Sequence, residues 1–426
     1  MLKHLFVVFL LVFATNSFAQ KTPVREKDST KSTNDSIKKN TFLKSIGNGY
    51  IPLGYFNLDL RYLVKFNQFE GFRSGLGGVT NNKFSERYRI NSYLVYGFVD
   101  KRYKYKIGGS VRLNKTSNTW INLAYTDDLK ETGSSTFLTD KRFFTFFEPR
   151  LLNIDLFHRH ITKAVSIEHQ LTNHLLSVSQ LAVSKINPTY NYSYLFNGKN
   201  YNTFDVSTAK VSLQWSPFSN FEVIKGKVNT IKEGYPKFTL QFTQGFKSVF
   251  GSDFNFSKLD FRSVHKITHL NKAETNITLV AGAAVGEIPL THLYHAYPNN
   301  ITKETILQRF SVAGINSFET MYFNEFFSDK FSTLQLKHFF KPFKIAERFR
   351  PQLVLISRHA IGDMNSIDRH QGIAFNTLKK LYSESGFEIN KLFFGFGLSF
   401  AYRYGGYHLA NLEDNIAFKF TFNISL

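Results

Sequence analysis

Residues Asp414–Leu426 read DNIAFKFTFNISL and alternate between two kinds of side chain. One set is Ile416, Phe418, Phe420, Phe422, Ile424 and Leu426. The other set is Asn415, Ala417, Lys419, Thr421, Asn423 and Ser425. A period of two places these sets on opposite faces of a β-strand. A strand that is apolar on one face, polar on the other and unbroken to the last residue is typical of the closing strand of a transmembrane β-barrel.

The same alternation recurs upstream, in segments 86–98, 102–114, 208–216, 237–246 and 394–403. Further strand candidates are centred on 71–79, 119–126, 162–171, 174–185, 257–267, 275–286, 317–327, 330–340, 351–359 and 383–390. Each strand alone would also fit a soluble β-sandwich with an apolar inner face. A long series of such strands, with Tyr and Phe near their ends, favours a membrane barrel. We therefore predict an all-β, antiparallel transmembrane barrel of about sixteen strands (roughly 14 to 18), closed by the C-terminal strand.

The N-terminus has the features of a secretory signal peptide. Lys3 precedes an apolar run from Leu5 to Phe13, and the small residues Ser17 and Ala19 follow. This arrangement predicts cleavage after Ala19, which makes residues 1–19 the signal peptide. The apolar run is too short to span a bilayer, so it is not expected to remain as an anchor.

Residues 20–45 are rich in Lys, Ser, Thr, Asn and Asp and contain few apolar side chains. Such a segment buries too little apolar surface to fold, so we expect a flexible periplasmic tether. From residue 46 to residue 426 the composition does not change, and we predict one barrel domain over this range. A barrel of this length is ordinary, whereas a single soluble core of this length is not.

Composition agrees with an envelope protein. Aromatic residues make up 16% of the chain although its mean hydropathy is slightly negative, as expected when apolar side chains occupy alternate positions. The absence of cysteine excludes disulfides, thiolate chemistry and a lipoprotein anchor. The formal charge of +21 favours anionic partners, and removal of the signal peptide takes away only Lys3. The compartment argues against nucleic acid and favours lipopolysaccharide, phospholipid headgroups or anionic solutes.

The long connections conflict with the predicted strand list. They are 128–160, 287–316 and 360–382. If the last strand runs toward the periplasm, 360–382 lies outside the cell, whereas the other two lie on the periplasmic side. Periplasmic turns of such barrels are short. Either a strand is missed or split in this list, or the barrel is unusual.

Several segments resemble an outer-membrane barrel family of Bacteroidota known only as a domain of unknown function. They are FNQFEGFRSGLGG (66–78), SYLVYGFVDKRYKYKIGG (92–109), AVGEIPLTHLYH (284–295), FNEFFSDKFSTLQLKHFF (323–340) and the closing strand. That family often follows a carboxypeptidase-regulatory-like β-domain, in whose place this chain has only the short tether. The family is distantly similar to the surface-antigen superfamily of barrel-assembly and translocation proteins, whose barrels have sixteen strands. The resemblance implies an outer-membrane barrel and does not specify an activity.

A set of basic residues is predicted to face the barrel interior: Arg87, Arg89, Lys104, Lys106, Arg112, Lys210, Lys258, Arg262, Arg403 and Lys419. Few carboxylates, among them Asp260 and Glu388, offset these charges. An interior lined by cations would concentrate anions and repel cations. Alternatively, these residues pair with carboxylates of the loops and the interior is filled. Both interpretations stay open.

Patterns that could carry catalysis or metal binding are weak. The pairs His158/His160 and His292/His295 lack a third ligand in sequence, so we expect interfacial or surface-loop histidines and no metal site. Glu168 is expected to face away from its neighbours Ser166 and His169, and no G-x-S-x-G elbow is present, so no enzyme is predicted. The glycines of GFRSGLGG (71–78) are not followed by Lys-Ser/Thr and a helix, as a phosphate loop would require. No catalytic residue, cofactor or metal is therefore predicted.

The sequence thus predicts an outer-membrane β-barrel, and two functions follow from its two possible interiors. The first is a pore or transport component with an anion-preferring lumen. The second is a plugged structural or envelope-assembly barrel that works through periplasmic partners. A lipid-modifying enzyme is a third, weaker hypothesis. Expected partners are outer-membrane lipid and lipopolysaccharide, the barrel-assembly machinery during insertion, and anionic solutes.

Overall fold

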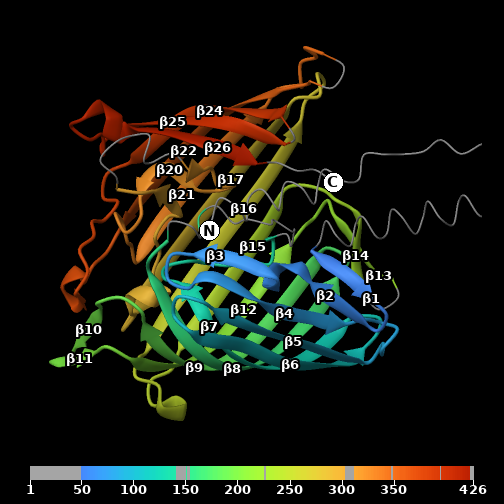
Figure 1. Ribbon diagram of the computed structural model, residues 1–426. Coiled ribbons are helices and arrows are strands. Elements are labelled where there is room, and N and C mark those ends of the chain that lie inside the picture. Colours follow the sequence, from blue (N-terminus) through green and yellow to red (C-terminus); the bar gives the residue numbers. More distant parts are fainter. Residues whose placement is uncertain are drawn as a thin grey trace, which may run out of the picture. The chain divides into compact units, whose positions relative to one another are not determined.

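The computed structural model describes residues 49–140, 150, 154–224, 227–302, 311–346, 349–393 and 395–422 (Figure 1). The predicted signal peptide (1–19) and tether (20–45) lie outside these residues. Nineteen strands form one sheet, and three small sheets accompany it. Within the described ranges, no helix is both long enough and apolar enough to cross a membrane.

The large sheet begins with an interrupted strand. Its halves, β2 (Phe56–Asp59) and β3 (Val64–Asn67), both pair with β4, and the 3-10 turn η1 (Leu60–Tyr62) separates them. Asp59 accepts a hydrogen bond from the N–H of Arg61, which caps η1 and breaks the strand. A short strand, β1 (Tyr50–Leu53), forms a hairpin with β2.

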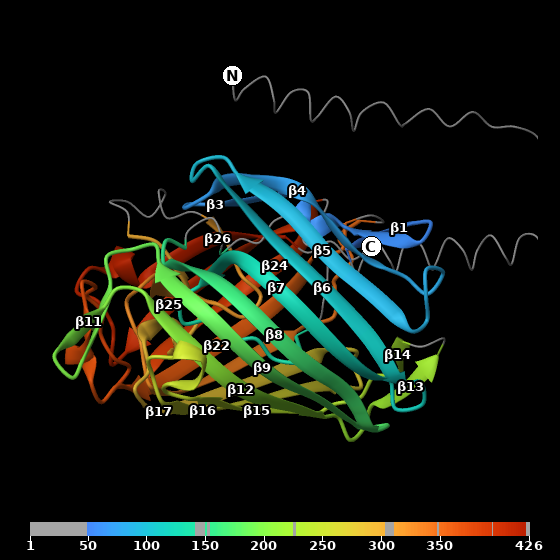
Figure 2. The ribbon, with the colours of Figure 1, turned by 90° about the horizontal axis from the view of Figure 1, so that it is seen from below.

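The other wall strands follow in chain order, each antiparallel to the next. They are β4 (Gly71–Thr80), β5 (Tyr88–Gly97), β6 (Arg102–Asn114), β7 (Thr119–Glu131), β8 (Phe157–Thr172), β9 (Leu175–Pro188), β12 (Phe204–Trp215), β15 (Lys237–Gly245), β16 (Phe256–Thr268), β17 (Glu274–Gly286), β21 (Lys330–Phe339), β22 (Gln352–Asp363), β24 (Tyr382–Phe393), β25 (Phe396–Gly405) and β26 (Ile416–Phe422). Figure 2 shows β5 to β9 as one tilted run of neighbours. Counted with β2–β3 as one strand, the described wall has sixteen strands, as predicted.

Two errors in the predicted strand list compensate each other in that count. Segment 317–327 was predicted as a wall strand, but its strand β20 (Phe318–Tyr322) pairs only with β18 (Pro298–Asn300), in a separate small sheet. The interrupted first strand at 56–67 was not predicted. With both corrected, the antiparallel order places the connections 128–160, 287–316 and 360–382 at the same end of the barrel. We call this end the loop end; it is the end opposite the start of the first wall strand.

The two faces of the wall have the predicted composition. In β26, Phe418 and Phe420 are 45% and 42% exposed, whereas Lys419 and Thr421 on the opposite face are 1% and 4% exposed. In β6, Ile107 is exposed and Lys104 is buried. A soluble protein buries its apolar rows, so exposed apolar rows backed by buried polar rows are the distribution of a transmembrane barrel.

The edge of β26 is not paired with the first wall strand among the described residues. The backbone groups along this edge pair instead with β19 (Ser311–Val312), which runs parallel to β26. The N–H of Ala313 continues this pairing by donating to the carbonyl of Phe420 at 2.7 Å. Over the described residues, this edge of the C-terminal strand therefore contacts an internal segment.

Shorter elements lie in the connections. They are β10 (Ser193–Phe196), β11 (Lys199–Tyr201), β13 (Asn220–Ile224), β14 (Lys227–Lys232), β23 (His370–Gln371), η3 (Val249–Gly251), η4 (Leu290–His292), η5 (Ile367–Arg369) and η6 (Leu412–Asn415). Apolar side chains from the long connections pack with the loop-end residues of β9 to β24 into one buried cluster, which includes Tyr194, Phe254, Leu290, Phe318 and Tyr382. The interior is therefore apolar and packed at the loop end.

Candidate functional site

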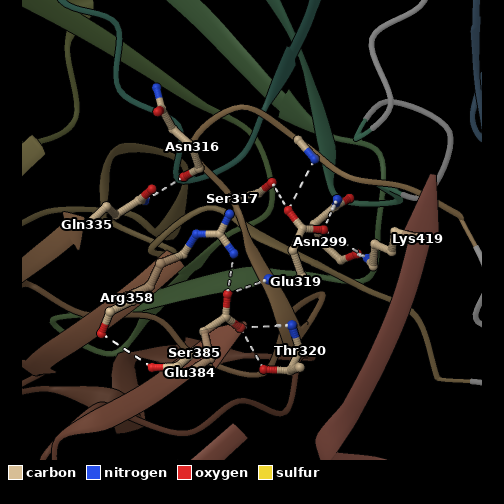
Figure 3. Close-up of polar contacts among 12 residues, drawn as sticks. Asn299, Asn316, Ser317, Glu319, Thr320, Gln335, Arg358, Glu384, Ser385 and Lys419 are labelled. Carbon is tan, nitrogen blue, oxygen red and sulfur yellow. Dashed lines mark hydrogen bonds and ion pairs between the residues drawn. The ribbon is translucent and has the colours of Figure 1, made fainter. Parts of the chain in front are cut away.

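The connection between β17 and β21 runs inside the wall and carries β18 and β20 (Figures 1 and 3). We call residues 287–329 the interior connection. In its described part, Phe318, Met321 and Phe327 are almost fully buried. The strands that it contacts through polar side chains are β21, β24, β25 and β26.

Glu384 of β24 is the first centre of these polar contacts, and it is fully buried. Its carboxylate accepts the backbone N–H groups of Glu319 and Thr320, both at 2.9 Å, and the Thr320 hydroxyl at 2.6 Å. Nη1 of Arg358, on the neighbouring strand β22, donates to the same carboxylate at 2.7 Å (Figure 3). The backbone N–H groups of Glu319 and Thr320 thus find their acceptor in a carboxylate of the wall, in place of the carbonyl groups of a neighbouring strand.

Glu319 of β20 is the second centre and is also fully buried. Its carboxylate accepts hydrogen bonds from the Ser317 hydroxyl at 2.8 Å, the Asn299 amide at 2.8 Å and the Gly314 N–H at 3.1 Å. Nζ of Lys419 lies 3.3 Å from it and also donates to the carbonyl of Asn299. Lys419 is on β26, so the interior connection is fastened to the last wall strand by side chains as well as by β19.

Two further ion pairs flank these centres. Arg403 of β25 makes a two-point contact with Glu325 at 2.6 and 3.1 Å, and Lys337 of β21 lies 3.3 Å from Glu388 of β24. With Glu319, Glu384, Arg358 and Lys419, the set contains four carboxylates and four cations, so its formal charge is zero. We call these eight residues the interior ion network. Removing one member of a buried ion pair leaves the other uncompensated, which costs about 3–5 kcal/mol.

Nine of the ten predicted basic residues divide into two groups. Three of them pair with carboxylates of the long connections: Arg262 with Asp140, Arg403 with Glu325, and Lys419 with Glu319. Lys104 pairs with Glu70 at 2.6 Å and Asp100 at 2.5 Å, both in turns at the loop end. Lys258 lies 3.6 Å from Asp260 on its own strand. For the first four of these residues the geometry is that of the second interpretation, pairing with carboxylates of the loops, whereas Lys258 pairs within the wall.

The second group lies on β5, β6 and β12. Arg89 and Arg112 both lie over the ring of the buried Trp120, at 4.0 and 4.5 Å from its centroid. Lys106 and Lys210 are half-buried and form no ion pair in the described part of the chain. The inward positions that surround them on β7 to β9 are also half-exposed, whereas those of β24 to β26 are buried. Solvent therefore reaches the inner face on this side of the barrel.

The tenth basic residue, Arg87, does not lie in the wall. It is exposed in the turn before β5, and its guanidinium lies 5.8 Å from the ring of Tyr88. In the predicted C-terminal insertion strand, Phe418 and Phe420 face outward. Phe422 ends β26, and Ile424 and Leu426 lie outside the described residues.

The two histidine pairs each contain one buried and one half-buried member. His158 is buried and lies 3.1 Å from the Thr132 hydroxyl, and His295 is buried with Nε2 at 2.6 Å from Glu131. Burial, together with nearby lysines, lowers the pKa of His292 to about 3, so its imidazole is neutral. Within the described ranges, no three His, Cys, Asp or Glu side chains are placed to hold a metal ion. The expectation of a surface loop was wrong for His295, because the connection that carries it folds inward, whereas His158 and His160 lie on the inner face of β8.

The serine–histidine–carboxylate candidate is also placed differently from the prediction. Ser166 and Glu168 share the inner face of β8, where Nδ2 of Asn122 lies 3.2 and 3.0 Å from them. His169 bonds to the Thr119 hydroxyl at 2.6 Å on the other face. The prediction that Glu168 faces away from Ser166 was therefore wrong, since residues two apart in a strand share a face. The three side chains do not converge on one point.

The glycine-rich segment 71–78 forms β4 and has a packing role. A Cβ on Gly75 would lie 2.1 Å from the carbonyl oxygen of Leu94, and one on Gly77 would lie 2.6 Å from the ring of Tyr62. The glycines thus allow β4 to approach β5 and η1 closely.

A model described as "Family of unknown function (DUF5686) C-terminal domain" matches residues 53–339, more than half of the chain. The chain belongs to the DUF5686 family. This agrees with the predicted resemblance to a barrel family of unknown function. The matched range runs from β1 through the end of β21, so it includes all of the interior connection and Glu319.

Among solved structures, this DUF5686 chain is similar to BamA from Haemophilus ducreyi lacking POTRA domains 1–3, with 11% identity and a TM-score of 0.50. The match covers 94% of this chain and 79% of that one. CdiB from Escherichia coli (9% identity, TM-score 0.44) and from Acinetobacter baumannii (10%, 0.41) also match over 83% of this chain. The chain spans 60% and 57% of those two proteins. No curated protein has a significant sequence match. At such identities the likeness to BamA shows the barrel fold alone.

Among the residues of the interior ion network, the sequence had singled out Arg403 and Lys419 and had noted Glu388. Glu384 and Arg358 occupy inward positions of alternating strands, so the period of two could have identified them. The sequence pattern did not identify Glu319 as a residue of the interior. The segment that carries it alternates like a wall strand, although it lies inside the wall.

Proposed function

We propose that this chain is an integral outer-membrane β-barrel of a Bacteroidota-type Gram-negative bacterium, delivered by its signal peptide and inserted by the barrel-assembly machinery. Its interior is kept filled by the interior connection, and it acts in envelope structure or assembly through partners at the periplasmic end. The exposed apolar rows of the wall support the location. Most of the long connections lie at the loop end, with 216–236 between β12 and β15 as the exception, and this supports an orientation with the loop end outside the cell.

The observation that carries this proposal is the interior ion network. A channel for anions needs cations that remain available to the permeating ion. Here Arg358, Arg403 and Lys419 are compensated by buried carboxylates, and the backbone of β20 is held by Glu384. The apolar cluster at the loop end adds a second obstacle to a free passage. No catalytic role is part of the proposal.

Planar-bilayer recordings test this proposal. We expect the full-length barrel to give no steady ion current, because the interior connection fills the passage. Glu384→Ala should give current, since it removes the acceptor for two backbone N–H groups of β20 and the partner of Arg358. Glu86→Ala, at an exposed pair with Lys115, is the control and should stay silent. A steady current through the unmodified barrel, unchanged by Glu384→Ala, would contradict the proposal.

An anion-preferring pore is the second candidate, and one observation favours it. Lys106 and Lys210 face the half-exposed side of the interior without an ion pair in the described part of the chain. If this side conducts, we expect Lys106→Glu to shift the reversal potential in a salt gradient toward cation preference. Lys104→Gln, which removes a cation already paired with Glu70 and Asp100, should shift it much less. Equal reversal potentials for all three proteins would remove this candidate.

A further inference from the structure

The outward face of the wall carries an unusual group of basic residues. Arg159 and Lys163 on β8 and Lys185 on β9 lie in the same rows as the exposed apolar residues Val165 and Leu181. In the other described wall strands, outward positions with Lys or Arg occur only at strand ends, at Lys330 and Lys391. Cations within an apolar surface are costly in lipid, so three on adjacent strands require a local explanation.

The strand register places these three residues together. Lys185 lies directly opposite Ile161, so Arg159 and Lys163 are its two diagonal neighbours across the β8–β9 pair. Diagonal neighbours on one face are about 7–8 Å apart. Lys163 and Lys185 are exposed and have no carboxylate partner among the described residues. Arg159 alone is paired, with Asp127 at 2.5 Å.

The group lies at the loop-end boundary of the apolar surface. On β8, Val165 and Ile167 continue the outward row away from the loop end, and on β9 Leu181 does the same. Lys163 is directly opposite Tyr125 of β7, whose ring stacks on Tyr105 at 5.8 Å. Aromatic residues mark the level where hydrocarbon meets headgroups. These cations therefore lie at headgroup height in the leaflet nearest the loop end.

A pocket adjoins the group on the loop side. Its volume is about 140 Å³, and its charged lining consists of Arg102, Arg159 and the Lys104–Asp100 ion pair. Arg102 is exposed and adds a fourth cation at this level. Like charges at such spacing repel one another, and an anion held between them removes the repulsion.

We propose that the outward face of β8 and β9 binds the phosphorylated headgroup of a lipid in the outer leaflet, with Lys163 and Lys185 contacting phosphate and Arg159 and Arg102 bordering it. The inference rests on the proposed outer-membrane location and orientation. If these lysines only extended along the apolar surface to place their ammonium groups among the lipid headgroups, similar lysines would be expected around the whole circumference of the barrel. Among the described wall strands, three outward cations on two adjacent strands, against one or none on each other strand, favour a defined site for one lipid over general attraction to the membrane surface.

The test compares Lys163→Gln/Lys185→Gln with the unmodified barrel and with Lys272→Gln/Lys391→Gln. The control pair removes the same charge from two exposed positions at the opposite end, Lys272 in the turn between β16 and β17 and Lys391 near the end of β24. Each full-length protein is reconstituted in phosphatidylcholine vesicles with diphosphorylated or dephosphorylated lipid A, extracted in detergent, and examined by native mass spectrometry for retained lipid. Inorganic phosphate is added in a parallel sample as a competitor.

We expect the unmodified and control proteins to retain diphosphorylated lipid A and the double variant to bind it about thirtyfold more weakly, from the usual effect of two surface cations. Dephosphorylated lipid A should not be retained, and millimolar phosphate should not displace the lipid. Equal retention by the double variant and the control, or equal retention of both lipids, would overturn the inference. Displacement by free phosphate would also overturn it, by assigning the site to a small anion. Gel mobility before and after heating reports insertion in each sample, and failure of the unmodified barrel to insert would instead refute the proposed location.

Discussion

Glu384→Ala is expected to lower the free energy of unfolding of the barrel by about 3–5 kcal/mol. The substitution leaves Arg358 buried without its carboxylate and leaves two N–H groups of β20 without an acceptor. Both the arginine and Glu384 are at most 1% exposed, so water does not compensate the loss. Urea unfolding of the purified barrel in detergent micelles, followed by gel mobility, measures the effect.

The matched control is Glu86→Ala, which breaks a pair with Lys115 at 2.8 Å. Both of those side chains are more than half exposed, so solvent screens the pair and we expect little or no change in the free energy of unfolding. Arg358→Met combined with Glu384→Gln should recover part of the stability, because no unpaired charge then remains in the interior. An equal effect of Glu384→Ala and Glu86→Ala would show that the interior ion network does not hold the interior connection.

Leu123→Arg is expected to impair membrane insertion, with a loss of about 2–4 kcal/mol. Leu123 lies in the middle of β7, between Gly109 and Val165 on its neighbours, and is 59% exposed on the outward face. An arginine there would face hydrocarbon. The fraction of heat-modifiable barrel formed in lipid vesicles, as a function of urea, measures the loss.

Leu113→Arg is the control for depth. Leu113 is 61% exposed, about the same exposed fraction as that of Leu123, but it directly precedes the last residue of β6. Near the interface the same substitution costs about 0–1 kcal/mol. In a water-soluble protein the two substitutions would have equal, small effects because both positions are exposed. Equal effects would therefore contradict the assignment of the outward face to lipid.

The alternation of side chains predicted most of the wall correctly. The strands at 102–114, 237–246 and the C-terminus lie where their period of two placed them, with their apolar rows outward. This succeeded because a wall strand meets two different environments, and each environment constrains every second residue. The same reasoning failed for 317–327. Its residues also alternate, but both faces meet protein inside the barrel.

The failure at 317–327 had a second consequence. Because one false strand was inserted between the connections, the predicted sides of 128–160 and 287–316 were inverted. The interrupted first strand was missed because Asp59 and η1 divide it into two pieces of four residues, each too short to show a period. The placement of the interior connection could not be predicted from local patterns, since it depends on contacts between residues such as Thr320 and Glu384 that are 64 positions apart.

By itself, the sequence determined the all-β class, fifteen of the sixteen wall strands and which face of each long strand is apolar, because these depend on a repeat that neighbouring residues share. Only the tertiary structure decided what the inward cations do. A lysine such as Lys419 has the same local pattern whether it faces an open lumen or a carboxylate, and the partner, Glu319, is brought to it by a connection that crosses the interior. Charge compensation in a barrel is set by which distant segments meet inside it, and strand periodicity carries no information about that meeting.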